Sequence, residues 1–359
     1  MPLAGGEASI PFTVVGIDLA KAVFQVHGVD KRGKAVLRKQ LKRRDVASFF
    51  ANLDPCLIGM EACGGAHYWA RKLGDLGHSV RLMAPQFVKP YVKTNKNDRN
   101  DAEAICEAVA RPNMRFVPVK TAEQQAVLSL HRARQGFVKA RTAQANQIRG
   151  LLAEFGIVIP KGIGHIAKRL PEILEEGENG LPGMMRALLV RLGEQLKALD
   201  QQVGELERQI KLWHRDNEQS RKLEEIAGIG PITASAFVAS VGDAKSFKNA
   251  RQVAAWLGMV PRHQGTGGKA MLGRISKRGD VYLRTLLIHG ARSVIAQLER
   301  KPEQADGWLK KLLARRNKNI AAVALAAKNA RIAWALLAHE RSYEGGYVAT
   351  RPGRVIAVG

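Results

Sequence analysis

Four acidic residues stand where their carboxylates could gather around a metal ion. Asp18 follows the apolar run TVVGI, Glu61 follows the run CLIGM, and Asp98 and Asp101 open a helical pattern. Residues three apart on a helix share a face, so the last two carboxylates point the same way. Phosphodiester hydrolysis and transfer commonly use paired metal ions, and Mg²⁺ prefers oxygen ligands of this kind. The four acids therefore predict a nuclease-type site.

Each acid also has an ordinary structural explanation. Asp98 could cap a helix, Glu61 could belong to a turn, and Asp101 could be part of a solvated helix start. The functional hypothesis depends on the set, because Asp18 and Glu61 both follow hydrophobic strands inside an otherwise basic protein.

The net charge indicates a polyanionic partner. Lys and Arg number 57 against 32 Asp and Glu, a formal charge of +25. Such a surface attracts polyanions such as nucleic acid; the alternatives are a protein that binds acidic membranes and a merely basic soluble protein. The start MPLAGGEASIPF lacks the features of a signal peptide, and no stretch approaches the roughly 18 uninterrupted apolar residues of a membrane helix. We therefore expect a cytoplasmic, nucleic-acid-binding protein with no membrane role.

Short apolar runs in the first hundred residues predict an α/β sheet domain. Residues 13–29 favour an antiparallel hairpin, residues 56–61 a strand followed by a turn and a helix, and Ser79 to Met83 a further strand. The cysteines, Cys56, Cys63 and Cys106, have no zinc-type spacing, and we expect them to be reduced and inert.

The middle of the chain is helical in pattern and basic. Residues 124–153 contain no acid and are expected to lie against phosphate or an acidic partner; their cations are Arg132, Arg134, Lys139, Arg141 and Arg149. Residues 160–183, rich in Gly and Pro, suggest a hinge. Residues 192–213 have a heptad pattern, which suits pairing within the chain as well as dimerisation.

The last part predicts a mostly helical, basic domain. Residues 223–242 resemble a helix-hairpin-helix, in which the turn at Gly228 and Gly230 would offer N–H groups to phosphate; an ordinary helical turn is the alternative. A glycine-rich segment follows whose cations could wrap a phosphate backbone. These cations are Arg262, Lys269, Arg274, Lys277, Arg278 and Arg284, against the single acid Asp280. A second acid-free basic stretch covers residues 307–339. Aromatic residues are only 6% of the chain, which disfavours a base-stacking platform.

Five segments in series resemble the DEDD transposases of the insertion sequence 110 and 1111 families. They are GIDLAK (16–21), GMEACGG (59–65), KNDRNDAEAICEA (96–108), IAGIGPITA (226–234) and the long segment from Trp256 to Arg292. The resemblance implies an α/β plus α chain. Its parts would be a ribonuclease-H-like, resolvase-type domain (1–118), a helical coiled-coil arm (119–219), a mostly α C-terminal transposase domain (220–345) and a tail (346–359).

The same resemblance implies an activity and its partners. Asp18, Glu61, Asp98 and Asp101 would hold Mg²⁺, with Mn²⁺ as a substitute. The partners would be double-stranded donor and target DNA, a structured noncoding guide RNA and further copies of the chain in a homodimer or homotetramer. A serine of the C-terminal domain would attack the phosphodiester and form a covalent protein–DNA intermediate.

At the nucleophile the sequence departs from the family pattern. Relatives have a serine two residues before the Gly-Gly-Lys motif, and Gly265 stands at that position here. A shift of one residue places Thr266 there, and its hydroxyl can act as a nucleophile although its methyl group crowds the approach. Ser276 is a poorer match. Three functions follow: a transposase using Thr266, a related invertase or junction-resolving nuclease using water, and a nucleophile-deficient DNA- or RNA-binding variant.

Overall fold

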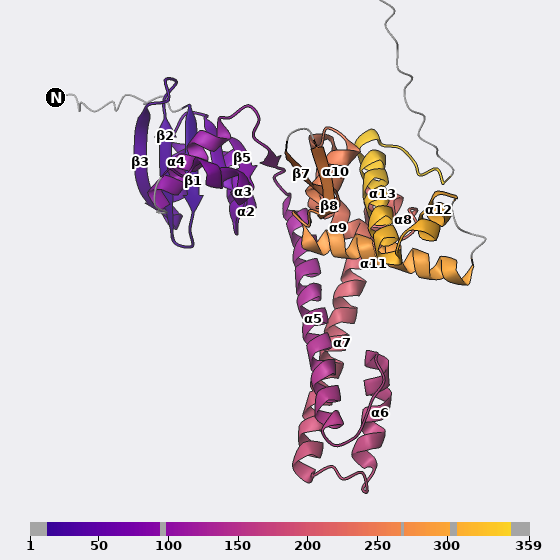
Figure 1. Cartoon of the computed structure of the whole chain (residues 1–359). Coiled ribbons are helices and arrows are strands. Elements are labelled where there is room, and N and C mark those ends of the chain that lie inside the picture. The colour runs from indigo at the N-terminus through magenta and orange to yellow at the C-terminus, as the bar shows by residue number, and fades with distance from the viewer. Residues whose placement is uncertain (1–12, 94–97, 267–268, 302–306, 346–359) are drawn as a thin grey trace, which may run out of the picture. The chain divides into compact units, whose positions relative to one another are not determined.

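The apolar runs of the N-terminal third form a six-stranded sheet (Figure 1). The computed structural model describes residues 13–93, 98–266, 269–301 and 307–345. They divide into two compact units, residues 1–125 and 126–359, whose described parts are treated separately below. Both the central sheet and the many helices agree with the predicted α/β plus α class. The predicted division into three parts and a tail stays a prediction.

The sheet of the first unit has the strand order β3-β2-β1-β4-β5-β6. Strands β1, β2 and β3 are antiparallel neighbours, β4 and β5 run parallel to β1, and β6 is antiparallel to β5. The bounds are β1 Val14–Leu19, β2 Val23–Val29, β3 Ala35–Lys42, β4 Leu57–Glu61, β5 Ser79–Met83 and β6 Phe116–Val117. The predicted hairpin and the two predicted strands that follow it are therefore confirmed.

Helices cover both faces of this sheet. Residues 15, 17, 58 and 60 point to one face and pack with α1 (Val46–Ala51) and α2 (Ala66–Asp75). Because side chains alternate along a strand, Gly16 and Gly59 point to the other face. There they meet α4 (Asp98–Val109). The remaining helical segments of this unit are η1 Arg43–Asp45, α3 Pro85–Val88 and η2 Lys89–Tyr91.

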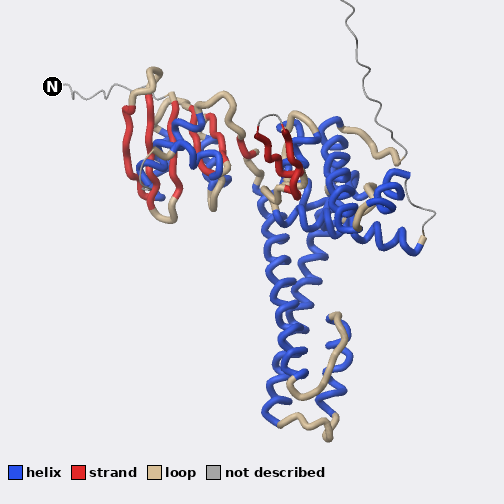
Figure 2. Tube along the Cα trace, viewed as in Figure 1, coloured by secondary structure: helices blue, strands red, loops and turns tan. Residues whose placement is uncertain are grey.

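The second unit begins with two long helices that lie side by side (Figure 2). Helix α5 (Ala122–Ala153) and helix α7 (Gly183–Asp216) run antiparallel, as their ion pairs Arg134–Glu207 and Arg141–Asp200 show. The buried residues of α7 recur every seven positions, as a helical seam requires. They include Leu189, Leu196, Val203 and Ile210. The heptad pattern therefore reflects pairing within the chain, and dimerisation through it stays a prediction.

The segment predicted as a hinge contains a helix instead, so that prediction is wrong in part. Helix α6 (Ile163–Glu175) lies within residues 160–183 and includes Pro171, which has no N–H to donate to the preceding turn. Ile166, Leu170 and Ile173 are buried in a core shared with α5 and α7. Burial of these three side chains outweighs the cost of the proline.

The C-terminal part of this unit is a helical cluster with its own core. Its elements are α8 Glu218–Glu224, α9 Pro231–Val241, η3 Ala244–Ser246, α10 Ala250–Trp256, β7 Pro261–Thr266, β8 Lys269–Ile275, α11 Val281–Arg300, α12 Gly307–Arg315 and α13 Lys318–His339. Helix α13 is long and apolar enough to cross a membrane by length and composition alone. Half of its 22 residues are buried, and they pack in the core of this cluster.

Candidate active site and nucleic-acid surface

Asp18 and Glu61 come together because their strands are parallel neighbours. Ile17 of β1 pairs with Met60 of β4, so the next residues of the two strands are the two acids. Each acid lies two residues after a glycine that faces α4, and side chains two apart share a face of a strand. Both carboxylates therefore stand on the α4 side, at the same edge of the sheet.

The thiol of Cys63 lies beside these two acids. Its pKa is raised by burial first, and then by the negative charges of Glu61 and Asp18. The residue itself is exposed, so the acids and the thiol are at the surface. A raised pKa lowers the thiolate fraction, which agrees with the inert character expected of Cys63. Cys56 and Cys106 are buried, and burial raises the pKa of each thiol to about 11.

Helix α4 carries the other two acids and lies in unusually close contact with the strands. A Cβ atom on Gly16 would stand 2.3 Å from the carbonyl oxygen of Ala102 and 2.4 Å from the amide nitrogen of Cys106. A Cβ on Gly59 would meet the side chain of Val109 at 2.7 Å. The two glycines therefore fix the height of α4 above β1 and β4, and with it the position of Asp101. Sequence reasoning missed both, although each stands two residues before an acid.

The donor set suits a hard divalent cation. Asp18, Glu61 and Asp101 are partly buried carboxylates, and carboxylate oxygens are ligands that Mg²⁺ accepts. Asp98 begins α4, and its side chain lies outside the described residues. Within the described residues no cluster of three or more His, Cys, Asp or Glu side chains has the closeness of a metal site. The described side chains thus show two acids brought together, with Asp101 on the helix above them.

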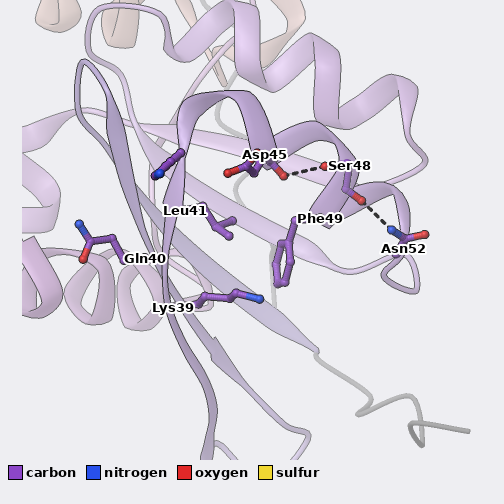
Figure 3. A pocket seen from close by; sticks show the side chains of 8 residues that line it. Lys39, Gln40, Leu41, Asp45, Ser48, Phe49 and Asn52 are labelled. Carbon is purple, nitrogen blue, oxygen red and sulfur yellow. Dashed lines mark hydrogen bonds between the residues drawn. The ribbon is translucent and has the colours of Figure 1, made fainter. Parts of the chain in front are cut away.

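A separate pocket of about 460 Å³ lies between β3 and α1 (Figure 3). Ser48 donates a hydrogen bond to the carbonyl oxygen of Asp45 at 3.0 Å, and Asn52 donates to the carbonyl oxygen of Ser48 at 2.9 Å. The Lys39 ammonium lies 4.9 Å from the centre of the Phe49 ring. Leu41 also lines this pocket and belongs to the core on the α1 and α2 face of the sheet. The pocket is therefore not part of the acidic site.

Several cations of α5, expected to lie against phosphate or an acidic partner, have partners within the second unit. Arg141 forms an ion pair with Asp200, and Arg134 donates to Glu207 through Nε at 2.9 Å. Arg149 donates to the carbonyl oxygens of Pro160 and Gly162. These contacts hold the two-helix arm together. Arg132 and Lys139 are exposed on α5.

Arg284 is the clearest correction. Its side chain was expected on a nucleic-acid surface, but the residue is 7% exposed. The guanidinium donates to the carbonyl oxygens of Leu257 at 2.8 Å and Arg278 at 3.0 Å. A buried guanidinium with backbone partners cannot reach a phosphate, so Arg284 supports the loop before α11 instead.

The other predicted cations of this region are exposed where they are described. Arg262, Arg274, Lys277 and Arg278 all lie at the surface. Lys269 and Thr266 lie opposite each other at the ends of β8 and β7, and their side chains are outside the described residues. Gly265 is exposed in β7 and pairs with Ala270.

The glycines of the predicted helix-hairpin-helix differ in their surroundings. Gly228 has a φ of +88°, and a Cβ there would stand 2.9 Å from the carbonyl oxygen of Gly290 in α11. Gly230 precedes α9, is exposed and has open space around it. The first glycine therefore serves packing of the α8–α9 turn against α11, and only the second has room for a phosphate.

Comparisons with known proteins agree on one family for both units. A transposase family model of the IS110 DEDD type matches residues 15–157, and the model of the IS116/IS110/IS902 transposase family matches residues 220–306. A probable family 20 transposase of Pseudomonas aeruginosa is 55% identical over 92% of this chain and 98% of the relative.

Two further relatives are similar over most of their length. The transposase for insertion sequence element IS1111A of Coxiella burnetii is 45% identical over 93% of this chain and 92% of the relative. The transposase for element IS1328 of Yersinia enterocolitica is 45% identical over 90% of this chain and 96% of the relative.

Proposed function

The chain belongs to the IS110-type family of insertion-sequence transposases, and from this premise we propose that it cuts and rejoins DNA at a magnesium site. Asp18, Glu61, Asp98 and Asp101 would supply the metal ligands, with Mn²⁺ as a substitute. The domain that carries them would be of the ribonuclease-H-like, resolvase type.

One structural observation supports the proposal most. The parallel pairing of β1 with β4 puts Asp18 and Glu61 at neighbouring strand ends, and Gly16 and Gly59 let α4 lie directly above. Both acids are partly exposed, as a site that must receive a phosphodiester requires. Two-metal phosphoryl-transfer sites need carboxylates gathered in this way.

The chain's own groups divide the work of the reaction. Bound Mg²⁺ would neutralise phosphate charge and activate the attacking oxygen. Lys277 and Arg278 are exposed cations that can neutralise the phosphate of the strand being cut. The hydroxyl of Thr266 would lose its proton to water and attack phosphorus; its oxygen–phosphorus bond would form while a DNA phosphorus–oxygen bond breaks, and the departing sugar oxygen would take up a proton from water. Reversal by another strand's hydroxyl would rejoin the DNA.

The partners follow from the family and the charge. We propose that donor and target DNA duplexes are brought together by a homodimer or homotetramer, and that a structured noncoding RNA of the element guides the choice of site. The formal charge of +25 suits contact with several nucleic-acid strands. The cytoplasm is the expected location.

A recombination assay on plasmids tests this function. The plasmids would carry the element's ends with its flanking RNA-coding segment, and a target. We expect rejoined junctions with wild-type protein and Mg²⁺, and none with Asp101→Asn. Junctions formed equally by Asp101→Asn would overturn the assignment of the metal ligands.

The glycine at position 265, where the family has a serine, supports a second candidate function. If Thr266 does not act, the acids could direct water at the phosphodiester as in a junction-resolving nuclease or an invertase-related enzyme. Free DNA ends without rejoined junctions would identify hydrolysis. Duplex binding with neither product would identify a nucleophile-deficient binding variant.

A further inference from the structure

The strands β7 and β8 form a separate two-stranded ribbon, and most of its described side chains are exposed. They pair with each other and make up a sheet of their own (Figures 1 and 2). Met271 is 68% exposed and Leu272 is 66% exposed. Consecutive residues of a strand point to opposite faces. Each face of the ribbon therefore presents a large apolar side chain to water.

The base of the ribbon is held firmly by the helical cluster. Ser276 N donates to Val260 O at 2.8 Å, and Lys277 N donates to Gly258 O at 3.0 Å. A Cβ on Gly258 would stand 2.0 Å from the carbonyl oxygen of Arg278, so only glycine allows the two segments to touch. The buried guanidinium of Arg284 adds two hydrogen bonds at the same place.

The backbone at the foot of the ribbon is also strained. Lys277 has a φ of 54°, a left-handed conformation that is rare for residues other than glycine. Such strain persists only where the surroundings enforce it, and it is common at functional sites. The rigid backbone at the foot of the ribbon therefore fixes the direction of the ribbon.

The charge around the two apolar side chains is positive. Arg262 and Arg274 are exposed on the strands, and Lys277 and Arg278 at the foot. Residues 261–275 contain no acid. A second copy of this chain would bring the same positive ribbon and a net charge of +25, which disfavours it as the occupant of this surface.

We propose that the β7–β8 ribbon enters the major groove of double-stranded DNA edge-on, with Met271 and Leu272 against the base edges on either side of it. This inference rests on the proposed function, because it assumes that DNA is the substrate. Stacked β-sheets pack about 10 Å apart, so one sheet with its side chains occupies about that thickness, and the major groove is about 12 Å wide. Arg262 and Arg274 would bind the phosphates that flank the groove.

The major groove offers a specific apolar partner for the two side chains. Each thymine places a methyl group there, and apolar side chains commonly contact it. Deoxyuridine forms the same base pair without that methyl group, so replacing thymine changes the major groove and leaves the hydrogen bonds of the pair unchanged.

The test measures binding of the full-length protein to two labelled duplexes by fluorescence anisotropy. The duplexes share one A·T-rich sequence, with thymine in one and deoxyuridine in the other. We expect wild-type protein to bind the thymine duplex about fourfold more tightly for each methyl group buried. The double variant Met271→Ser/Leu272→Ser should bind both duplexes equally.

Two further variants separate the apolar from the electrostatic part. Met184→Ser/Leu188→Ser changes the same residue types on α7, where they are 85% and 40% exposed, and should keep the thymine preference. Arg262→Gln/Arg274→Gln should keep that preference too, and should lower the slope of log affinity against log salt by about 1.8, or about 0.9 for each phosphate contact.

The possible outcomes separate a failure of the ribbon proposal from a failure of the proposed function. Equal binding of the two duplexes by wild-type protein, or a thymine preference that survives in Met271→Ser/Leu272→Ser, would overturn the ribbon proposal and leave the transposase function standing. No binding of wild-type protein to either duplex, with the element's RNA present as well as without it, would overturn the proposed DNA substrate itself. Melting curves would check that the exposed substitutions leave the fold intact.

Discussion

The carboxylates of Asp18 and Glu61 both act on the thiol of Cys63. Both negative charges contribute to raising the pKa of that thiol, although burial contributes more. Two acids that act on a common neighbour lie in one electrostatic environment. A divalent cation bound there would find negative charge already gathered, which lowers the cost of assembling the site.

At the same scale, His131 links three helices by a buried polar contact. Its ring is 1% exposed; Nδ1 lies 3.0 Å from the Tyr282 hydroxyl and Nε2 lies 3.1 Å from the Ser235 hydroxyl. Burial, with a smaller contribution from the nearby charge of Arg134, lowers the pKa of His131 to about 4. The imidazole is therefore neutral in the folded protein at neutral pH.

Because His131 is buried in its neutral form, we expect the folded protein to lose stability in acid. The pKa of His131 is lower in the folded than in the unfolded chain, so its contribution is complete above pH 6.5 and is lost as the pH falls from 6.5 towards 4. The loss should approach about 3 kcal/mol of unfolding free energy. Denaturant titrations at pH 7.5 and pH 4.5 measure it. His131→Gln should remove this share of the pH dependence, whereas the exposed His165→Gln should retain it; equal slopes for all three proteins would contradict the assignment.

At the scale of elements, the contact between α4 and the sheet positions the candidate site. Gly16→Ala would drive a Cβ into the backbone of Ala102 and Cys106. The helix must then move, at a cost of about 1–3 kcal/mol or more in unfolding free energy. Since α4 carries Asp98 and Asp101, we also expect recombination activity to fall.

The matched control is Gly74→Ala in α2. Gly74 is a helical glycine with no atom within 4 Å of its would-be Cβ, so alanine should stabilise the protein by about 0.5–1 kcal/mol. Thermal melts and activity assays of Gly16→Ala and Gly74→Ala test whether the close approach of α4 to the sheet is needed. Wild-type stability in Gly16→Ala would show that the close approach of α4 is not needed.

A second close contact joins the turn between α8 and α9 to helix α11. A Cβ on Gly290 would stand 1.8 Å from the carbonyl oxygen of Gly228. Gly290→Ala should therefore lower the unfolding free energy by about 1–3 kcal/mol. Gly136→Ala, on an open face of α5, should raise it. Circular-dichroism melts provide the comparison, and equal melting temperatures for the two variants would refute the packing role of Gly228.

Sequence patterns predicted the strands and helices that have a regular buried face. They missed the strands that have few buried residues. Strands β1, β4 and β5 are apolar runs, and α4 has a regular buried face. Strand β3 was missed because it is an edge strand with the charged sequence AVLRKQLK and a single buried residue, Leu41. The β7–β8 ribbon was interpreted as a flexible glycine-rich loop because its exposed faces leave no alternating pattern.

The sequence indicated the acids of the candidate site but not the glycines that let α4 lie close to them. Asp18 and Glu61 could be found because acids at the ends of apolar strands are conspicuous. The roles of Gly16 and Gly59 depend on how closely a helix from another part of the sequence approaches, which local patterns do not encode. Arg284 was misjudged for the same reason, because its partners Leu257 and Arg278 become its neighbours only through folding.

The whole molecule consists of two units with separate cores. The cores of the first unit include Ile17 and Ile105, and those of the second include Ile148 and Phe237. Separate cores predict two thermal transitions in calorimetry. Gly16→Ala should shift one transition and Gly290→Ala the other. A single transition that moves with both variants would show that the two units unfold together.

The most direct test of this account is a denaturing gel that detects DNA covalently attached to the protein. The reaction contains the element's RNA, labelled donor and target DNA, and Mg²⁺. We predict an adduct with wild-type protein that disappears in Asp18→Ala and in Thr266→Ala, whereas the exposed-acid control Asp75→Asn retains it. An adduct that persists in Asp18→Ala would contradict the acidic site. An adduct seen only in Gly265→Ser would show that the site is intact and that Thr266 is not the nucleophile.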